Sequence, residues 1–287
     1  MIYEDWVKHR RSAEQIIESL VLQAEEAMVG DSSLINAAKS AVVAQFSALP
    51  FSQRVWEVFF VNTGTLAGVK RIDKRPYATH PTRMALSCYW LANHQLAEDS
   101  AVPALLHDYL EESGGISRAS IAALNARLPS EPLAIPAAVL LSEPDISYEI
   151  LGSSDEESKL KRVAYAIQAR DALQKGFPVA FANASIVDKL DNLHDLGYLD
   201  KESVPEKRSR KIAQRIAFFQ LTLQLIGPQA SPKFQRMLAD AIKFRTQEFN
   251  LETLLCEELD ALKNIQKRCE TTIQNMIGLY HKSIGLH

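Results

Sequence analysis

The spacing of apolar residues constrains this chain more than any other feature, because it is helical almost from end to end. Apolar residues recur every third or fourth position in segment after segment, as they do along one face of an α-helix. The alternation of apolar and polar residues that indicates a strand is nearly absent. Helices are predicted at 4–28, 31–48, 52–60, 82–97, 101–112, 117–127, 133–142, 156–175, 179–197 and 205–226, and over most of the C-terminal region. The predicted fold class is all-α.

Turn-forming residues divide this helical pattern into three parts. Leu49-Pro50 interrupts it near the N-terminus, and Gly227-Pro228 interrupts it again before the last helices. A chain of 287 residues can form one large domain or two small ones. The expected parts are an N-terminal helical extension, a central domain, and a C-terminal helical segment packed on that domain or extending it, over 1–48, 49–228 and 229–287.

An apolar stripe runs along the C-terminal segment. Its members recur at helical spacing and are Leu251, Leu255, Leu259, Leu262, Ile265, Cys269, Ile273 and Met276. A stripe of this kind usually packs inside its own domain or against a paired helix. The alternative is a homo-oligomer in which two copies meet through these C-terminal helices.

Charge and cysteine content indicate the cellular compartment and the classes of partner to expect. The net charge of −3 gives no sign of a broad surface for nucleic acid or for a membrane. No apolar run is long enough to span a bilayer, and the first residues lack the apolar core of a signal peptide. The three cysteines, Cys88, Cys256 and Cys269, have neither metal-ligand spacing nor the even number of a disulfide framework. We therefore expect a cytoplasmic protein.

An adjacent histidine and aspartate follow an apolar stretch in PALLHDYLEE. His107 and Asp108 are followed one turn later by Glu111 and Glu112. Unpaired charge is costly in a buried helix, so these ionisable groups need compensation. A divalent cation supplies it, and imidazole together with carboxylate suits Mn²⁺, Fe²⁺ or Zn²⁺. The segment therefore predicts a metal site, with both glutamates facing the same groove.

Two further clusters fit such a site. In SIVDKLDNLHDL, the side chains of Asp188, Asp191 and Asp195 share one helix face. This face is either a solvated acidic surface or a buried one that needs a partner for its charge. The apolar FPVAFANASIV before it favours the buried alternative. The loop-like VKRIDKRPYATHP is polar and basic, and its basic residues are Lys70, Arg71, Lys74, Arg75 and His80. Loop bases are usually solvated, but beside a metal and carboxylates they would complete a phosphate pocket.

Four blocks of this sequence resemble a known family. The order His80, His107-Asp108 and Asp191 is similar to the H…HD…D signature of HD-superfamily phosphohydrolases. PYATHPTRMA resembles the PYxxHPxxVA segment of the (p)ppGpp hydrolase domains in RelA/SpoT-type enzymes and small alarmone hydrolases, and VPALLHDYLEE resembles their AALLHDxxED. VDKLDNLHDL is similar to KLADRLHNM, and VPEKRSRKIAQ is similar to xPEKRxxIA. The blocks follow the family's order and cover roughly residues 65–228.

The resemblance implies a fold, a metal and a role for each matching residue. The fold would be an HD-domain helical bundle with extra N- and C-terminal helices. The expected metal ion is Mn²⁺, in preference to Fe²⁺ or Zn²⁺. The implied metal ligands are His80, His107, Asp108 and Asp191. Glu111 and Glu112 match the family's Glu-Asp pair, which acts on the water and the leaving group. Arg71 matches an arginine associated with the nucleotide base, and Asp195 occupies the position of an asparagine that contacts the ribose.

The implied activity is removal of the 3′-pyrophosphate from (p)ppGpp-type alarmones, as in the stringent response. Three departures keep alternatives open: Glu112 replaces Asp, Asp195 replaces Asn, and Ile72 stands where the family often has a basic residue. One alternative is an HD phosphohydrolase on another nucleotide, such as ppApp, a dNTP or an NMP. The other is a degenerate HD domain that serves as a binding module or as an antitoxin.

Overall fold

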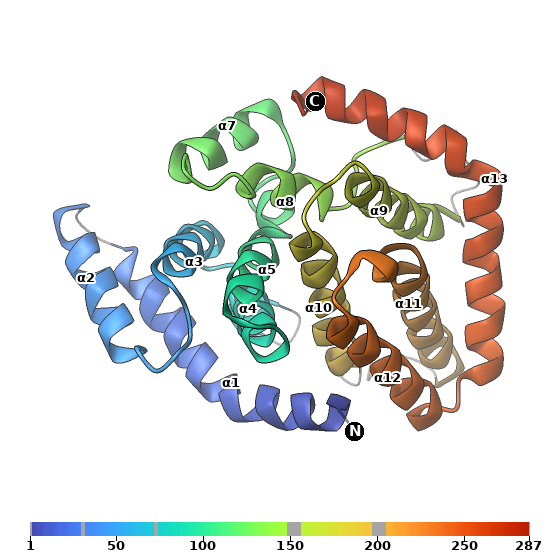
Figure 1. The fold of residues 1–287 in the computed structure, drawn as a ribbon, viewed down its shortest axis with the longest axis horizontal. Coiled ribbons are helices and arrows are strands. Elements are labelled where there is room, and N and C mark those ends of the chain that lie inside the picture. Colours follow the sequence, from blue (N-terminus) through green and yellow to red (C-terminus); the bar gives the residue numbers. More distant parts are fainter. Residues whose placement is uncertain (1, 30–31, 72–73, 148–155, 197–204, 287) are drawn as a thin grey trace. The chain divides into compact units, whose positions relative to one another are not determined.

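Helices form nearly all the regular structure in a computed structural model of the chain (Figure 1). It describes residues 2–29, 32–71, 74–147, 156–196 and 205–286. The helices are α1 (Ile2–Ala27), α2 (Ser32–Gln45), α3 (Gln53–Leu66), α4 (Thr79–Leu91), α5 (His94–Leu106), α6 (Tyr109–Glu112), α7 (Arg118–Arg127), α8 (Ala134–Leu140), α9 (Glu157–Gln174), α10 (Val179–Asp195), α11 (Pro205–Ile226), α12 (Pro232–Glu248) and α13 (Glu252–Ile284), with a short 3₁₀ turn η4 (Gly227–Gln229). Within the described ranges no strand forms, and the all-α prediction is confirmed.

The chain divides into two compact units. The first, called the N-terminal unit, comprises residues 4–138, and the second, called the C-terminal unit, comprises 139–287 together with 1–3. The boundary near residue 138 falls inside the segment 49–228 that the sequence predicts as one domain. Each unit is described by itself below.

The N-terminal unit is built around the pair α4 and α5, which pack along each other and are joined by a two-residue connection. Helix α3 packs on α5, and α6 packs on both α3 and α5. Helix α1 is tied to α4 by a hydrogen bond from Trp6 Nε1 to Ser87 Oγ, 3.1 Å long. The core between these helices is apolar and partly aromatic, with Trp56 and Phe59 in edge-to-face contact.

The break between α4 and α5 differs from the sequence prediction, which placed it between 97 and 101. Ala92 has extended backbone angles, and the side chain of Asn93 accepts a hydrogen bond from Leu96 N as the N-cap of α5. Asparagine is among the preferred N-cap residues, because its side-chain oxygen satisfies a backbone N–H that the helix leaves unpaired. Asn93 therefore starts a new helix where apolar spacing alone predicted a continuous one.

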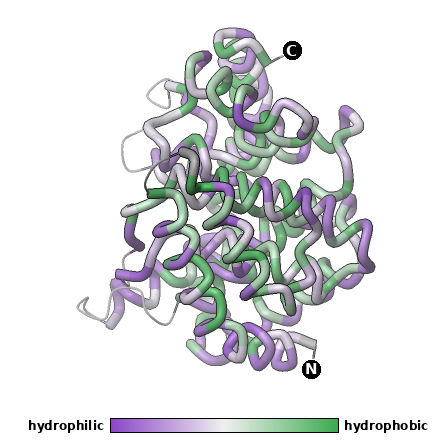
Figure 2. The backbone as a smooth tube through the Cα atoms, turned by 90° about the vertical axis from the view of Figure 1, so that its left-hand side faces the viewer, coloured by the Kyte–Doolittle hydropathy of each residue, from purple (hydrophilic) through white to green (hydrophobic). Residues whose placement is uncertain are grey.

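The C-terminal unit packs α9, α11 and α13 against one another, while α10 lies against α12, α9 and α11. The apolar stripe of the last helix is mostly buried here, from Leu255 to Ile273. An oligomer through this helix, which stays a prediction, would therefore use another face of α13. Figure 2 shows apolar and hydrophilic stretches alternating along the helices, as amphipathic packing requires.

Among the described residues, none of the helices combines the length and the apolar composition needed to cross a membrane.

Candidate metal centre

Two buried histidines lie together in the N-terminal unit. His80 is in the first turn of α4, and His107 directly follows the last residue of α5. Because α4 and α5 form a hairpin, the start of one helix lies beside the end of the other. The two rings are 5.1 Å apart between centroids, and the ligand nitrogens lie within 4.8 Å of each other. This histidine pair could hold a metal ion.

The hydrogen bonding of His107 orients the ring for that task. Its Nδ1 lies 2.9 Å from Ala104 O, and since a carbonyl oxygen only accepts, Nδ1 carries the proton. Its Nε2 lies 2.9 Å from Asp108 Oδ2. If the ring is neutral, the lone pair of Nε2 faces a carboxylate oxygen, and two acceptors at this distance repel each other. A proton on Nε2 or a shared cation removes the repulsion.

The chemistry of these donors fits a transition-metal ion. A metal-bound histidine commonly donates its other ring N–H to a backbone carbonyl, as His107 does to Ala104. Two imidazoles and a carboxylate suit Mn²⁺, Fe²⁺ or Zn²⁺, and the geometry does not select among them.

Asp108 is held by a tyrosine. The Tyr77 hydroxyl donates a 2.8 Å hydrogen bond to Asp108 Oδ2, the same oxygen that faces His107. Burial raises the pKa of Tyr77 far above its usual value, and the negative charge of Asp108 raises it further. Tyr77 therefore remains a proton donor to Asp108. Tyr77 was not among the predicted functional residues, although it stands three positions before His80.

The basic loop forms a tight turn that places Arg71 near this tyrosine. Tyr77 N donates to Val69 O, and Arg71 N donates to Arg75 O, both at 2.9 Å. The guanidinium carbon of Arg71 then lies 5.8 Å from the centroid of the Tyr77 ring. Lys74 adopts a positive φ of 68° in this turn, where most side chains are strained. Arg71 is thus connected to Asp108 through a single intervening side chain.

The other bases of the loop are placed differently. Arg75 forms an ion pair with Glu14 on α1, so it would have to exchange this partner to bind a phosphate. Lys70 and Lys74 are exposed. Ile72, the third departure from the family pattern, lies outside the described residues.

Glu111 and Glu112 lie on the single turn of α6 and are exposed. The expected four-residue relation to the His-Asp pair is retained, since Glu112 N donates to Asp108 O at 3.0 Å. The charge of Glu112 also contributes to raising the pKa of Tyr77, after burial and Asp108. Glu112 is therefore close to the Tyr77–Asp108 pair.

The aspartates of the second cluster lie on α10 in the C-terminal unit. Asp188 and Asp191 are buried and Asp195 is half-buried, so a solvated acidic face does not describe this helix. The carboxylate of Asp188 pairs with Lys189 Nζ and accepts a 2.5 Å hydrogen bond from Asn192 Nδ2.

Lys189 is a buried cation that the sequence analysis did not identify. Its ammonium lies 4.3 Å from the centroid of the Tyr165 ring and 5.2 Å from that of Phe218. Burial by itself lowers the pKa of Lys189, but Asp188 and Tyr165 outweigh this effect and raise the pKa above its usual value. The lysine therefore stays charged and compensates Asp188.

Comparison of the chain with protein-family models, with curated proteins and with solved structures gave no match. The resemblance to the HD superfamily therefore rests on the sequence motifs.

Proposed function

We propose that this chain is a metal-dependent phosphohydrolase that removes the 3′-pyrophosphate from a (p)ppGpp-type alarmone. The observation that carries the proposal is the buried pair of His80 and His107, together with the contact between His107 and Asp108. The two imidazole rings lie side by side, Ala104 O accepts a hydrogen bond from His107 Nδ1, and His107 Nε2 lies 2.9 Å from a carboxylate oxygen of Asp108. Asp191 is proposed as the fourth ligand on the basis of the sequence motif alone. Mn²⁺ is the proposed ion.

A divalent ion bound by these residues would lower the pKa of a coordinated water towards neutrality and offset the charge of the diphosphate. Glu112, with Glu111 beside it, would take a proton from the attacking water. Arg71 binds the anionic or base portion of the nucleotide above the Tyr77 ring. Tyr77 keeps Asp108 oriented by its hydrogen bond.

The reaction adds water across the bond between the 3′ oxygen and the adjacent phosphorus. The water oxygen bonds to phosphorus, the 3′ oxygen leaves with a proton, and pyrophosphate is released together with GDP or GTP. Glu112 or Glu111 passes the proton from the water to the leaving oxygen.

The test is incubation of the Mn²⁺-loaded protein with ppGpp, pppGpp and ppApp, resolving nucleotide and pyrophosphate products. We expect pyrophosphate release that is lost in EDTA and falls by about a hundredfold or more in Asp108→Asn, as for loss of one electrostatic group of an active site. The matched control is Asp5→Asn, which changes an exposed aspartate on α1 in the same unit. Full activity of Asp108→Asn would overturn the assignment.

A second substrate class is favoured by Asp195, which is half-buried at the end of α10. A carboxylate accepts hydrogen bonds but offers no amide donor to a ribose. The same assay therefore includes a dNTP and an NMP. Turnover of one of these, without turnover of the alarmones, would move the proposal to another nucleotide while keeping the metal centre.

A further inference from the structure

A cavity of about 600 Å³ lies in the N-terminal unit, away from the residues assigned to the metal. It is lined by residues of α2, α3, the end of α7 and the connection to α8. Val58, Val61, Leu128 and Pro129 supply apolar surface, and charged side chains complete the lining. A cavity of this volume is large enough for a small organic molecule.

Two cations in this lining are not neutralised by the protein. Lys39 Nζ lies 5.4 Å from the centroid of the Phe60 ring. Arg127 Nη1 donates to two neutral hydroxyls, Thr65 Oγ1 at 2.5 Å and Tyr109 Oη at 3.5 Å. Over the described part of the chain, neither cation has a carboxylate within ion-pair distance. Both charges therefore remain available to a ligand.

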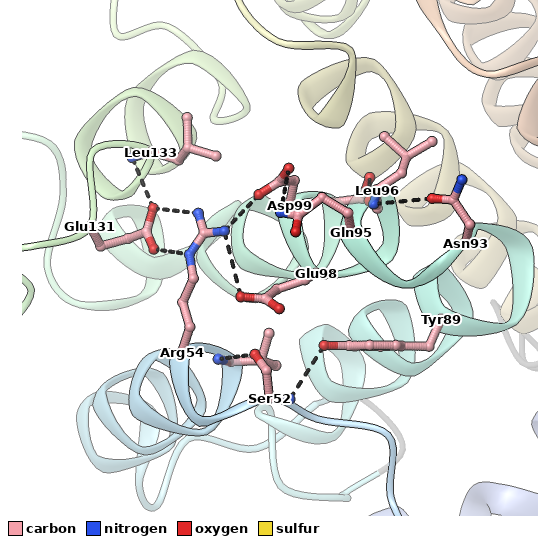
Figure 3. A network of polar contacts seen from close by, with 12 residues as sticks. Ser52, Arg54, Tyr89, Asn93, Gln95, Leu96, Glu98, Asp99, Glu131 and Leu133 are labelled. Carbon is pink, nitrogen blue, oxygen red and sulfur yellow. Dashed lines mark hydrogen bonds and ion pairs between the residues drawn. The ribbon is translucent and has the colours of Figure 1, made fainter.

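The third cation of the lining, Arg54, is different. Its guanidinium forms a two-pronged contact with Glu131, at 2.6 and 2.9 Å, and a 2.6 Å contact with Asp99 (Figure 3). These carboxylates neutralise Arg54 and fix the cavity wall where α3 meets the connection after α7. Arg54 is thus a structural group here.

Among the described residues, one acid of the lining forms no ion pair. Glu57 is exposed on α3 and accepts a 3.2 Å hydrogen bond from Gln53 Nε2. Its negative charge opposes anion binding. Neutralising Glu57 should therefore strengthen the binding of an anion, whereas neutralising Lys39 or Arg127 should weaken it.

We propose that this cavity binds a small organic anion with a flat apolar body, its phosphate or carboxylate held by Lys39 and Arg127. The apolar body lies on the surface formed by Val58, Val61 and Leu128. This site is additional to the proposed hydrolase activity and requires no metal.

The experiment uses two fluorescent probes with the full chain in EDTA. Anilinonaphthalene sulfonate is aromatic and anionic, and N-phenylnaphthylamine is its uncharged counterpart. We expect Lys39→Gln and Arg127→Gln each to weaken sulfonate binding by about tenfold, as for loss of one hydrogen bond to a charged group. Glu57→Gln should strengthen it. Binding of the neutral probe should stay the same in all three variants.

The control is Arg11→Gln, which removes an exposed cation of α1 outside the cavity lining and should leave both probes unaffected. Circular dichroism establishes that each variant is folded. Displacement of the bound sulfonate by pyrophosphate or by benzoate then separates a phosphate ligand from a carboxylate ligand. Unchanged sulfonate affinity in both cation variants, or equal changes for the two probes, would overturn the proposal. Because EDTA is present throughout, failure here leaves the proposed hydrolase untouched.

Discussion

Tyr77 is the residue whose contacts most directly determine the geometry of the proposed metal centre. Its hydroxyl donates to Asp108 Oδ2, the oxygen that also faces His107 Nε2. Loss of that hydrogen bond removes one restraint on the rotation of the carboxylate relative to the histidine ring. The outer partners of metal ligands commonly affect metal affinity for this reason.

At this scale we predict that Tyr77→Phe weakens Mn²⁺ binding by about tenfold or more, the effect typical of losing such a partner. Isothermal titration with Mn²⁺ measures it. Tyr89→Phe is the matched control, because the Tyr89 hydroxyl contacts Ser52 N and none of the proposed ligands. Equal Mn²⁺ affinity in the wild type and Tyr77→Phe would show that Asp108 does not depend on this hydrogen bond or does not bind the ion.

Sequence reasoning identified the individual candidate residues but not their partners. His80, His107 and Asp108 were found because ionisable residues after an apolar run need compensation. Arg75 was read as a phosphate ligand, yet it pairs with Glu14, 61 positions earlier. Lys189 was overlooked because a lysine is usually exposed, and the aromatic rings that enclose it come from α9 and α11. Such pairings depend on the tertiary fold, which local spacing does not encode.

At the scale of the elements, one side chain in the C-terminal unit connects α9 and α13 with the last residues of α8 and the loop after it. Gln168 on α9 donates through Nε2 to the carbonyl oxygens of Val139, Leu140 and Ser142, and its Oε1 accepts from His281 Nε2 on α13 at 2.9 Å. His281 therefore contributes to packing as a neutral ring. Burial first, and then the nearby charge of Lys175, lower the pKa of His281 from 6.5 to about 4.

This lowered pKa predicts a loss of stability in acid. Between about pH 6.5 and pH 4 the unfolded chain binds a proton at this histidine and the folded chain does not, so the free energy of unfolding falls as the pH falls through this window. We expect His281→Asn to show a weaker pH dependence than the wild type over that range. Urea denaturation followed by circular dichroism at pH 7 and pH 5 measures the difference. Parallel losses in both proteins would contradict the assignment.

The helices themselves were largely predictable, because apolar periodicity is a local property. The junction of α4 and α5 was not, since one N-cap residue, Asn93, decides where the second helix begins. The position of the His-Asp pair was also not predictable from apolar spacing, which placed the pair inside a helix. In the structure α5 ends at Leu106 and α6 begins at Tyr109, so His107 and Asp108 form the junction between them.

At the scale of the whole molecule, the division into two units is the feature that the sequence did not predict. Turn residues indicated breaks near 49 and 228, whereas the compact units divide near 138. Proline and glycine mark where a helix ends, but which helices pack together depends on the complementarity of their faces. Residues 4–48 of the N-terminal extension belong to the N-terminal unit, and the C-terminal segment belongs to the C-terminal unit.

Metal binding by these residues should also raise the thermal stability of the intact chain. A ligand that binds only the folded state raises the melting temperature by mass action. We expect Mn²⁺ to raise the melting temperature of the wild type relative to EDTA, and Asp191→Asn to lose most of that rise, as Asp108→Asn does. Asp260→Asn, which changes an exposed residue on α13, should retain the full rise in melting temperature. Retention of the full rise in Asp191→Asn would remove Asp191 from the ligands and leave the histidine pair in place.

The hairpin of α4 and α5 has a further consequence for how such a chain can vary. His80 begins one helix and His107 follows the other, so their meeting depends on the number of residues in each helix and in the connection at Asn93. Deleting one residue from α5 would rotate His107 by about 100° around the helix axis. We therefore expect insertions and deletions to be tolerated here only when a change in one helix is compensated in the other. Relatives that share this centre should keep a nearly constant separation between the two motifs, while the lengths of their termini vary freely.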